Sequence, residues 1–247
     1  MVDVGMIPPD AARQARRVAR YYRWLDRLCW FDEKRAEAGH GALPVHRALA
    51  DPKGGAPSPY VIHGVMLEGL SLPAAPRVLD AGCGYGATML DLAPRLGGDW
   101  TGMTLSAVQA ARGNAEIAAR GLADRVRIVV GSYDAPLPGR FDLAYGIESL
   151  IHSADPARTV ANIAASLNPG GHLVVVDDMP EEALPAEAAG RLARFRRFWR
   201  CPAAPTRDGW LAAFRAAGLE LVAERDLNPL LQVRDMAALR PRLAALE

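Results

Sequence analysis

The stretch Val78–Gly86, VLDAGCGYG, decides the fold of this chain of 247 residues. A short apolar run ends in an acid, Asp80, and glycines at 82, 84 and 86 then open a segment of helical composition. Glycine adopts backbone torsions that other residues resist and lets a ligand come close to the main chain. The N-terminus of a helix behind the turn favours a carboxylate or a pyrophosphate. The stretch therefore predicts a strand, a ligand-binding turn and a helix.

From Arg77 onward, short apolar runs alternate with longer helical ones, which predicts β-α units on a parallel sheet. We expect strands at residues 77–81, 100–104, 125–130, 141–146, 172–177 and 219–224. We expect helices at 86–96, 106–120, 154–167 and 206–217, and a separate helix over 184–200. Before the sheet, one or two helices are predicted over 9–38, a loop over 39–59 and a short helix over 60–70. The predicted fold is α/β, with a doubly wound, mostly parallel sheet that binds ligands at the carboxyl ends of its strands.

Composition and charge narrow the classes of function. The net charge of +1 disfavours a nucleic-acid substrate, because such proteins usually carry a strong positive field. No apolar run is long enough to span a membrane, and the first residues do not read as a signal peptide, so we expect a cytoplasmic protein. The three cysteines are widely spaced and lie in no cluster with histidine, so we expect no metal site. The oligomeric state stays open.

The glycine turn alone does not identify the ligand. Gly82, Gly84 and Ala87 also satisfy the GxGxxA pattern of dinucleotide-binding proteins. Such proteins place an acid about 20 residues further on to hold the ribose. The second strand here ends instead in GMTLS, residues 102–106, which contains no acid. This departure from the dinucleotide-binding pattern leaves the ligand of the glycine turn open.

Three further motifs follow in order: GMTLSAVQ at 102–109, FDLAYGIESLIHSADP at 141–156 and LNPGGHLVVVD at 167–177. With the glycine turn, they resemble a branch of class I S-adenosylmethionine-dependent methyltransferases, over about residues 76–226. This branch includes sterol and geranyl-diphosphate C-methyltransferases, cyclopropane synthases of mycolic acids, and spinosyn- or rebeccamycin-type natural-product methyltransferases. The resemblance implies a Rossmann-like class I fold, S-adenosylmethionine as cofactor and a small-molecule acceptor that takes the methyl group on carbon or oxygen. An isoprenoid or another natural-product intermediate is an example of such an acceptor.

The resemblance also implies which residues bind the cofactor. They follow the ends of strands one to four: Asp80, Gly82, Gly84, Gly86, Thr104, Leu105, Gln109, Ser132, Tyr133 and Tyr145. The relatives often carry an Asp after the third strand for the adenine amino group. Here the matching position is Ser132, followed by Tyr133 and Asp134, so the adenine-binding residue stays open among these three.

Glu148 and His152 follow the predicted fourth strand, where substrate meets cofactor in such enzymes. A carboxylate or an imidazole there can accept a proton, and we expect these two residues to be catalytic. The relatives cover the substrate pocket with N-terminal helices and an insertion after strand five. We therefore expect a lid and loop region at 1–75, a core at 76–247 with a helical insertion at 180–204, and pocket residues Tyr21, Tyr22, Arg197 and Trp199.

Arginines recur in both covering segments, at 13, 16, 17, 20, 23 and 27 and at 191, 194, 196, 197 and 200. Because guanidinium groups bind phosphate and carboxylate, these residues suggest an acceptor with an anionic head; solvated helix faces are the alternative. Two other functions stay open for the whole chain. One is a non-methylating cyclase or binding protein that keeps the cofactor pocket, and the other is an NAD(P)-dependent oxidoreductase.

Overall fold

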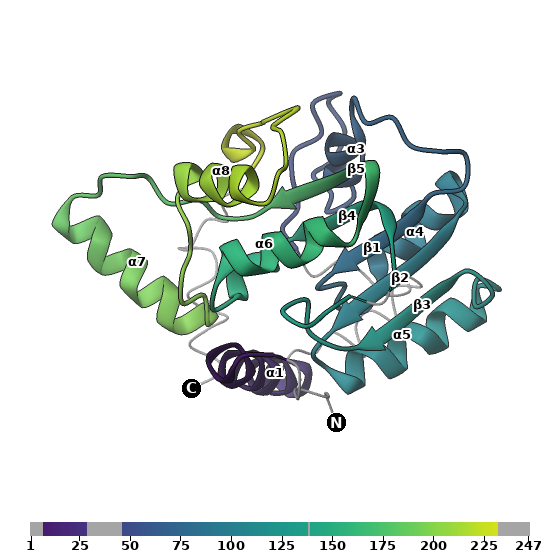
Figure 1. Ribbon diagram of the computed structural model, residues 1–247, viewed down its shortest axis with the longest axis horizontal. Coiled ribbons are helices and arrows are strands. Elements are labelled where there is room, and N and C mark those ends of the chain that lie inside the picture. The colour runs from purple at the N-terminus through teal and green to yellow at the C-terminus, as the bar shows by residue number, and fades with distance from the viewer. Residues whose placement is uncertain (1–6, 29–45, 138, 232–247) are drawn as a thin grey trace.

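The computed structural model describes residues 7–28, 46–137 and 139–231, without the side chains of residues 25–28. Five parallel strands form one sheet in the order β3-β2-β1-β4-β5 (Figure 1). They are β1 (Arg77–Ala81), β2 (Asp99–Thr104), β3 (Val126–Val130), β4 (Phe141–Ile147) and β5 (Leu167–Val176). The parallel α/β sheet predicted from the sequence is confirmed.

The helices fall close to their predicted positions. They are α1 (Pro9–Leu28), α3 (Val61–Leu67), α4 (Ala87–Leu96), α5 (Ala107–Ala119), α6 (Pro156–Ala165), α7 (Ala186–Trp199) and α8 (Arg207–Ala216). Two 3-10 turns, η1 (Leu150–His152) and η2 (Asn228–Leu230), complete the description. Residues 29–38, where the first predicted helix was to continue, lie outside the described residues.

Each face of the sheet has its own hydrophobic core, as a doubly wound sheet requires. On one face, α4 and α5 pack against Val78, Trp100 and Leu143. On the other face, α6 and α8 pack against Leu79 and Ala144, with Trp210 of α8 almost fully buried. Successive residues of a strand point to opposite faces, so neighbouring residues of β1 serve the two cores.

The strand order reverses between β1 and β4, because β2 and β3 lie on one side of β1 and β4 and β5 on the other. At such a switch point the loops after the two central strands diverge and leave a crevice for a ligand. The glycine turn follows β1 and the segment Glu148–His152 follows β4. In Figure 1, α1 lies below the sheet and α7 projects away from it on the left.

One predicted strand is wrong. Residues 219–224, LELVAE, form no strand, and β5 is the edge of the described sheet. Leu221 and Val222 are 48% and 71% exposed, so the apolar alternation of this segment is not matched by burial. The segment lines a wide cavity of about 1340 Å³ beside β5. Strand β5 itself begins earlier than predicted, at Leu167, with an irregularity opposite Phe141 and Leu143.

Candidate functional site

A cavity of about 450 Å³ lies at the carboxyl ends of β1, β2 and β4, and we call it the glycine-loop cavity. Seven of the predicted cofactor residues line it: Asp80, Gly82, Gly84, Thr104, Leu105, Gln109 and Tyr133. Both predicted catalytic residues, Glu148 and His152, line it too, as do Tyr22 and Trp199. Residues that lie far apart in the sequence therefore meet around one space.

Two glycines of the turn, Gly82 and Gly86, lie where a side chain would collide with neighbouring atoms. Gly82 has a φ of 98°, and a Cβ built on it would lie 2.4 Å from the Cβ of Ser149. Real Cβ atoms do not approach one another so closely. Gly86 does not line the cavity; a Cβ there would lie 2.8 Å from Cδ1 of Ile128, inside the core. Its role is to let α4 pack on the sheet.

Asp80 ends β1 with its carboxyl group buried beneath the glycine turn. Burial raises the pKa of Asp80 to about 7, and a hydrogen bond from the hydroxyl of Tyr145, 2.9 Å long, partly offsets this rise. Tyr145 is fully buried and contacts the site through this bond rather than by lining the cavity. A carboxyl group in this position gains its charge at little cost when a cation is placed beside it.

The raised pKa of Asp80 links stability to pH. The folded value of about 7 lies above the ordinary 3.8, so the folded state keeps a proton that the unfolded chain loses. The resulting stabilisation is fully present below about pH 4 and is lost as the pH rises through about 7. We expect the cofactor-free protein to melt at a lower temperature at about pH 8 than at about pH 5.5. Thermal unfolding of Asp80→Asn should show a flatter dependence over this range; an unchanged slope would contradict the raised pKa.

Thr104, Ser106 and Gln109 form a compact corner after β2. The Thr104 hydroxyl donates to Oε1 of Gln109 at 2.7 Å, and the backbone N–H of Gln109 donates to the Ser106 hydroxyl, which caps α5. Thr104 and Gln109 are buried in the cavity wall together with exposed edges of Leu105. This corner lies where the second strand ends without the acid that commonly binds the ribose.

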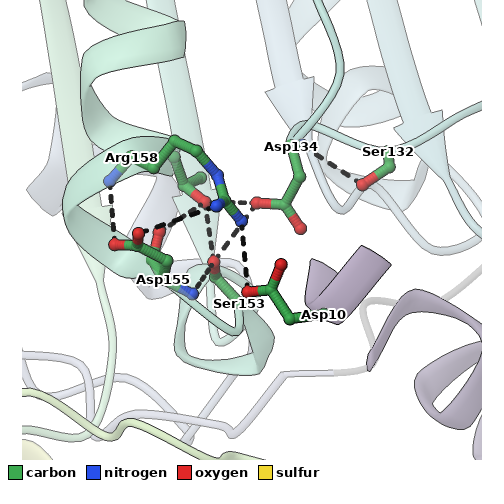
Figure 2. Close-up of polar contacts among 7 residues, drawn as sticks. Asp10, Ser132, Asp134, Ser153, Asp155 and Arg158 are labelled. Carbon is green, nitrogen blue, oxygen red and sulfur yellow. Dashed lines mark hydrogen bonds and ion pairs between the residues drawn. The ribbon is translucent and has the colours of Figure 1, made fainter. Parts of the chain in front are cut away.

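Ser132, Tyr133 and Asp134, the three candidates for the adenine contact, lie differently. Tyr133 lines the cavity, and its hydroxyl donates to the carbonyl of Ser149 at 2.8 Å. The Ser132 hydroxyl accepts the N–H of Asp134, and Asp134 in turn accepts from the Ser153 and Thr159 hydroxyls at the start of α6 (Figure 2). Neither Ser132 nor Asp134 lines the glycine-loop cavity. The arrangement therefore favours Tyr133 and gives the other two a role in holding the loop.

Around this loop, Figure 2 shows Arg158 between the carboxylates of Asp155 and Asp10. Asp155 also caps α6 by accepting the N–H of Arg158. Because Asp10 belongs to α1 and Arg158 to α6, the weak pair at 3.9 Å is a contact between these two helices.

Glu148 follows β4 with a φ of 50°, a left-handed conformation that is costly for a residue with a side chain. Its carboxylate accepts from the N–H and the Nε of Arg47, at 3.1 and 3.0 Å. Arg47 also donates to Asp178 at 2.7 Å. Glu148 is thus half of an ion pair at the cavity wall, and accepting a proton would cost it this pairing.

His152 is buried in the cavity wall between η1 and the end of α7. Its Nδ1 lies 3.4 Å from the carbonyl oxygen of Arg200, and its Nε2 lies 3.0 Å from the hydroxyl of Tyr22. A carbonyl only accepts, so Nδ1 carries the proton and Nε2 is a hydrogen-bond acceptor. Burial lowers the pKa of His152 and raises that of Tyr22, so both groups are neutral and the tyrosine donates to Nε2.

Helix α1 is fastened over the site by polar contacts. The side-chain amide of Gln14 donates to the carbonyls of His152 and Arg200 at 2.9 and 2.6 Å. Tyr21 packs edge-on against Tyr22 and Trp199, at ring distances of 5.3 and 6.3 Å. Tyr22 and Trp199 line the cavity as predicted, whereas Tyr21 supports them from behind.

The arginines of the covering segments do not point into the cavity. Arg197 is exposed and does not line it, contrary to the prediction. None of the other described arginine side chains in the two runs lines the cavity. Arg196 is half-buried and donates to the carbonyls of Ala203 and Ala204, and the others are exposed. The side chain of Arg27 lies outside the described residues. Solvated helix faces explain this pattern, and the anionic acceptor loses its support.

Sequence reasoning missed three charged residues of the cavity, Arg47, Asp177 and Asp178. Asp177 follows β5 and accepts the N–H of Ile151 at 3.1 Å. Burial raises its pKa well above the ordinary value, and the negative charges of Asp178 and Glu148 add to the rise. Two acids directly after the apolar run VVV were a signal for this position; Arg47, within a loop, gave none.

The described residues contain no helix long and apolar enough to cross a membrane. They also contain no group of three or more histidine, cysteine or acidic side chains that could hold a metal ion.

Comparison with solved structures agrees with this geometry. The 4+2 cyclase SpnF superposes with a TM-score of 0.72 at 26% identity, over 94% of this chain and 83% of that chain. Geranyl diphosphate C-methyltransferase from Streptomyces coelicolor A3(2), solved with S-adenosyl-L-homocysteine, gives 0.72 at 21% identity, over 91% of this chain and 86% of that one. At that identity, the second likeness shows the fold alone.

Curated relatives point the same way. The O-methyltransferase rstn1 of Aspergillus nomiae is 30% identical over 163 residues, which cover 65% of this chain and 72% of the relative. The probable chloroplastic tocopherol O-methyltransferase of Oryza sativa subsp. japonica is 42% identical over 101 residues, 40% of this chain. This match spans 28% of the rice protein, and the match to polyketide synthase ThaQ of Burkholderia thailandensis spans 7% of that chain.

The methyltransferase domain family matches residues 31–224, which include the whole described sheet and the glycine-loop cavity. The chain therefore belongs to the methyltransferase domain family, and its sheet has the Rossmann-like class I architecture.

Proposed function

We propose that this chain transfers the methyl group of S-adenosylmethionine to a hydroxyl group of a small, largely apolar molecule. The observation that carries the proposal is the neutral imidazole of His152 in the wall of the glycine-loop cavity, whose Nε2 is a hydrogen-bond acceptor paired with the Tyr22 hydroxyl. A hydroxyl is a poor nucleophile until its proton is removed, and a neutral imidazole within reach removes it. The named O-methyltransferases among the relatives support the choice of oxygen.

The cavity residues fit the cofactor. Gly82 and Gly84 line the cavity with backbone and no side chain, so a ligand can come close to the main chain, and the buried Asp80 offers an acceptor for a cationic ammonium group. Tyr133 and the corner of Thr104 and Gln109 line the walls where a nucleoside would lie. The bound cofactor supplies an electrophilic methyl group on a sulfonium, with a neutral thioether as leaving group.

The protein's own task is to orient the acceptor and to take its proton. An acceptor hydroxyl that reached Nε2 of His152 would replace the Tyr22 hydroxyl there and would give its proton to Nε2, which would make the acceptor oxygen nucleophilic. The Arg200 carbonyl then stabilises the imidazolium through Nδ1–H. Val18, Tyr22, Phe195 and Trp199 give the acceptor side of the cavity an apolar and aromatic lining. Residues 1–75 and the insertion at 180–204 act in this proposal as the cover of the core at 76–247.

Glu148 has a different role in this proposal from the one predicted from its position. Its carboxylate is paired with Arg47 in the cavity wall, so in this proposal it positions the loop rather than taking the proton. The two alternatives from the sequence separate by their products. Family membership sets the nicotinamide-dependent oxidoreductase aside. A cyclase, as SpnF is named, would convert its substrate without consuming S-adenosylmethionine.

The pH dependence of turnover tests the identity of the base. Burial lowers the pKa of His152 below its ordinary 6.5, and the neutral form is the active one. We expect kcat to be flat above about pH 7 and to fall in proportion to the unprotonated fraction only below about pH 6.5, with a slope of about one. The control is Glu148→Gln, whose profile should keep the same inflection. An inflection lost in Glu148→Gln would assign the base to Glu148.

A panel of acceptors tests the substrate class. Neutral phenols and alcohols with apolar bodies should be methylated, and the same molecules with the hydroxyl already blocked as a methyl ether should not react. Prenyl diphosphates are the contrasting arm, because the exposed arginines offer no anion site in the cavity. Methylation confined to carbon atoms of prenyl diphosphates would contradict the proposal.

A further inference from the structure

A buried histidine behind the glycine-loop cavity is not used by the chemistry proposed above. His63 of α3 has no exposed side-chain surface. Its Nδ1 lies 2.6 Å from Oδ2 of Asp91, and its Nε2 lies 3.2 Å from the hydroxyl of Thr88. Asp91 and Thr88 both belong to α4, one turn apart on the helix that follows the glycine turn.

These contacts fix the direction of each hydrogen bond. A carboxylate only accepts, so Nδ1 of His63 carries a proton and donates to Asp91. Burial lowers the pKa of His63, against the opposing charge of Asp91, so the ring is neutral and Nε2 has a lone pair. The Thr88 hydroxyl therefore donates its one proton to Nε2. Arg95 holds Asp91 from the outer side of the helix, and the rings of His46 and Tyr60 pack edge-on against His63.

Thr88 connects this chain of bonds to the cofactor site. It is 5% exposed in the first turn of α4 and lines the glycine-loop cavity beside Asp80 and Gly84. Because its proton is committed to His63, the Thr88 oxygen can interact with a ligand only as a hydrogen-bond acceptor. S-Adenosylmethionine carries donors of the matching kind, namely its ammonium and hydroxyl groups.

We propose that Asp91 and His63 are positioning residues that fix the hydroxyl of Thr88 as an acceptor for a donor group of the cofactor. The proposal rests on the cofactor assignment and deepens it, since it names a cofactor contact and the two residues that set its polarity. A threonine hydroxyl that rotates freely can either donate or accept a hydrogen bond. The pair of His63 and Asp91 leaves the Thr88 hydroxyl only as an acceptor for a ligand. The cavity then discriminates in favour of a ligand that presents N–H or O–H at this wall.

The test is a double-mutant cycle read by calorimetry with S-adenosylhomocysteine. Thr88→Val, which keeps the shape and loses the hydroxyl, should weaken binding about tenfold, and Thr88→Ser should stay close to the wild type. Asp91→Asn should weaken binding severalfold, because an amide can donate to Nδ1 and shift the proton to Nε2. In the Thr88→Val background, Asp91→Asn should then cause no further loss. The matched control is Asp99→Asn, an exposed carboxylate at the start of β2, which should bind as the wild type does.

Two results would overturn the proposal while the wild type still binds. Thr88→Ser could prove as weak as Thr88→Val, which would assign the effect to the methyl group, or the Asp91→Asn loss could persist in full without the Thr88 hydroxyl. Failure of the wild type to bind S-adenosylhomocysteine would overturn the cofactor assignment itself, and this inference with it.

Discussion

Replacing Gly84 by valine is expected to abolish binding of S-adenosylmethionine while leaving the chain folded. Gly84 has a φ of 54° and lines the glycine-loop cavity, so a side chain there enters the space that the cofactor needs. The left-handed conformation costs a residue with a Cβ about 1–2 kcal/mol. A domain stable by about 5–15 kcal/mol tolerates this cost. Calorimetry with the cofactor and thermal unfolding of the same variant measure the two effects separately.

Gly121→Val is the matched control. Gly121 follows α5 with a φ of 68°, and a Cβ built on it would have no atom within 4 Å. The control therefore adds similar backbone strain without touching the cavity, and it should lower the melting temperature while keeping cofactor affinity. Unchanged affinity in a folded Gly84→Val protein would show that the cofactor does not lie against the glycine turn.

Replacing His152 by asparagine is expected to lower kcat by about two orders of magnitude or more, the usual scale for loss of a general base. The asparagine amide can still donate toward the Arg200 carbonyl, so the loop keeps its anchor while the basic nitrogen is lost. Cofactor affinity should change little, since Asp80 and the glycine turn are untouched. Single-turnover rates with a saturating cofactor measure the chemical step directly.

Glu148→Gln is the comparison for that variant. Glutamine keeps an oxygen for the Arg47 N–H and loses the charge of the pair, so we expect a smaller fall in kcat than for His152→Asn. The reverse ranking, with near wild-type turnover in His152→Asn and a large loss in Glu148→Gln, would identify Glu148 as the proton acceptor. The hydroxyl of Tyr22 donates to Nε2 of His152, so the His152→Asn substitution also removes the hydrogen-bond partner of Tyr22.

The sheet could be predicted because its signals are local. Each of the five strands is a short apolar run followed by a turn, and the glycines at 82, 84 and 86 mark the first crossover. The sixth predicted strand, at 219–224, had the same local pattern, but a strand also needs a partner for its backbone hydrogen bonds. No sequence pattern shows whether the edge of β5 provides one.

The site shows the same division. Asp80, Gly82 and Gly84 were placed correctly in the cavity wall because they follow one strand directly. The pairing of Glu148 with Arg47 joins residues 101 positions apart, and that of His152 with Tyr22 joins residues 130 apart. These contacts determine which partners the two candidate bases have, and no local sequence pattern predicts them.

The direction of the arginines was equally beyond the sequence. Clustering on a helix predicts a charged face, but not whether the face meets a cavity or water. Arg197 lies on the exposed side of α7, whereas Trp199, two residues later, lines the cavity. A difference of two positions on a helix turns a side chain to the other side, so only the packing of α7 decides between the two interpretations.

Turnover of S-adenosylmethionine carrying a deuterated methyl group, with a neutral hydroxyl-bearing acceptor, tests the central claim most directly. Mass spectrometry follows the acceptor, the methylated product and S-adenosylhomocysteine in one reaction. The account predicts that the label appears on the acceptor oxygen and that one S-adenosylhomocysteine forms for each product molecule. Conversion of the substrate with the labelled cofactor left intact would contradict it and identify the chain as a cyclase that keeps a methyltransferase fold.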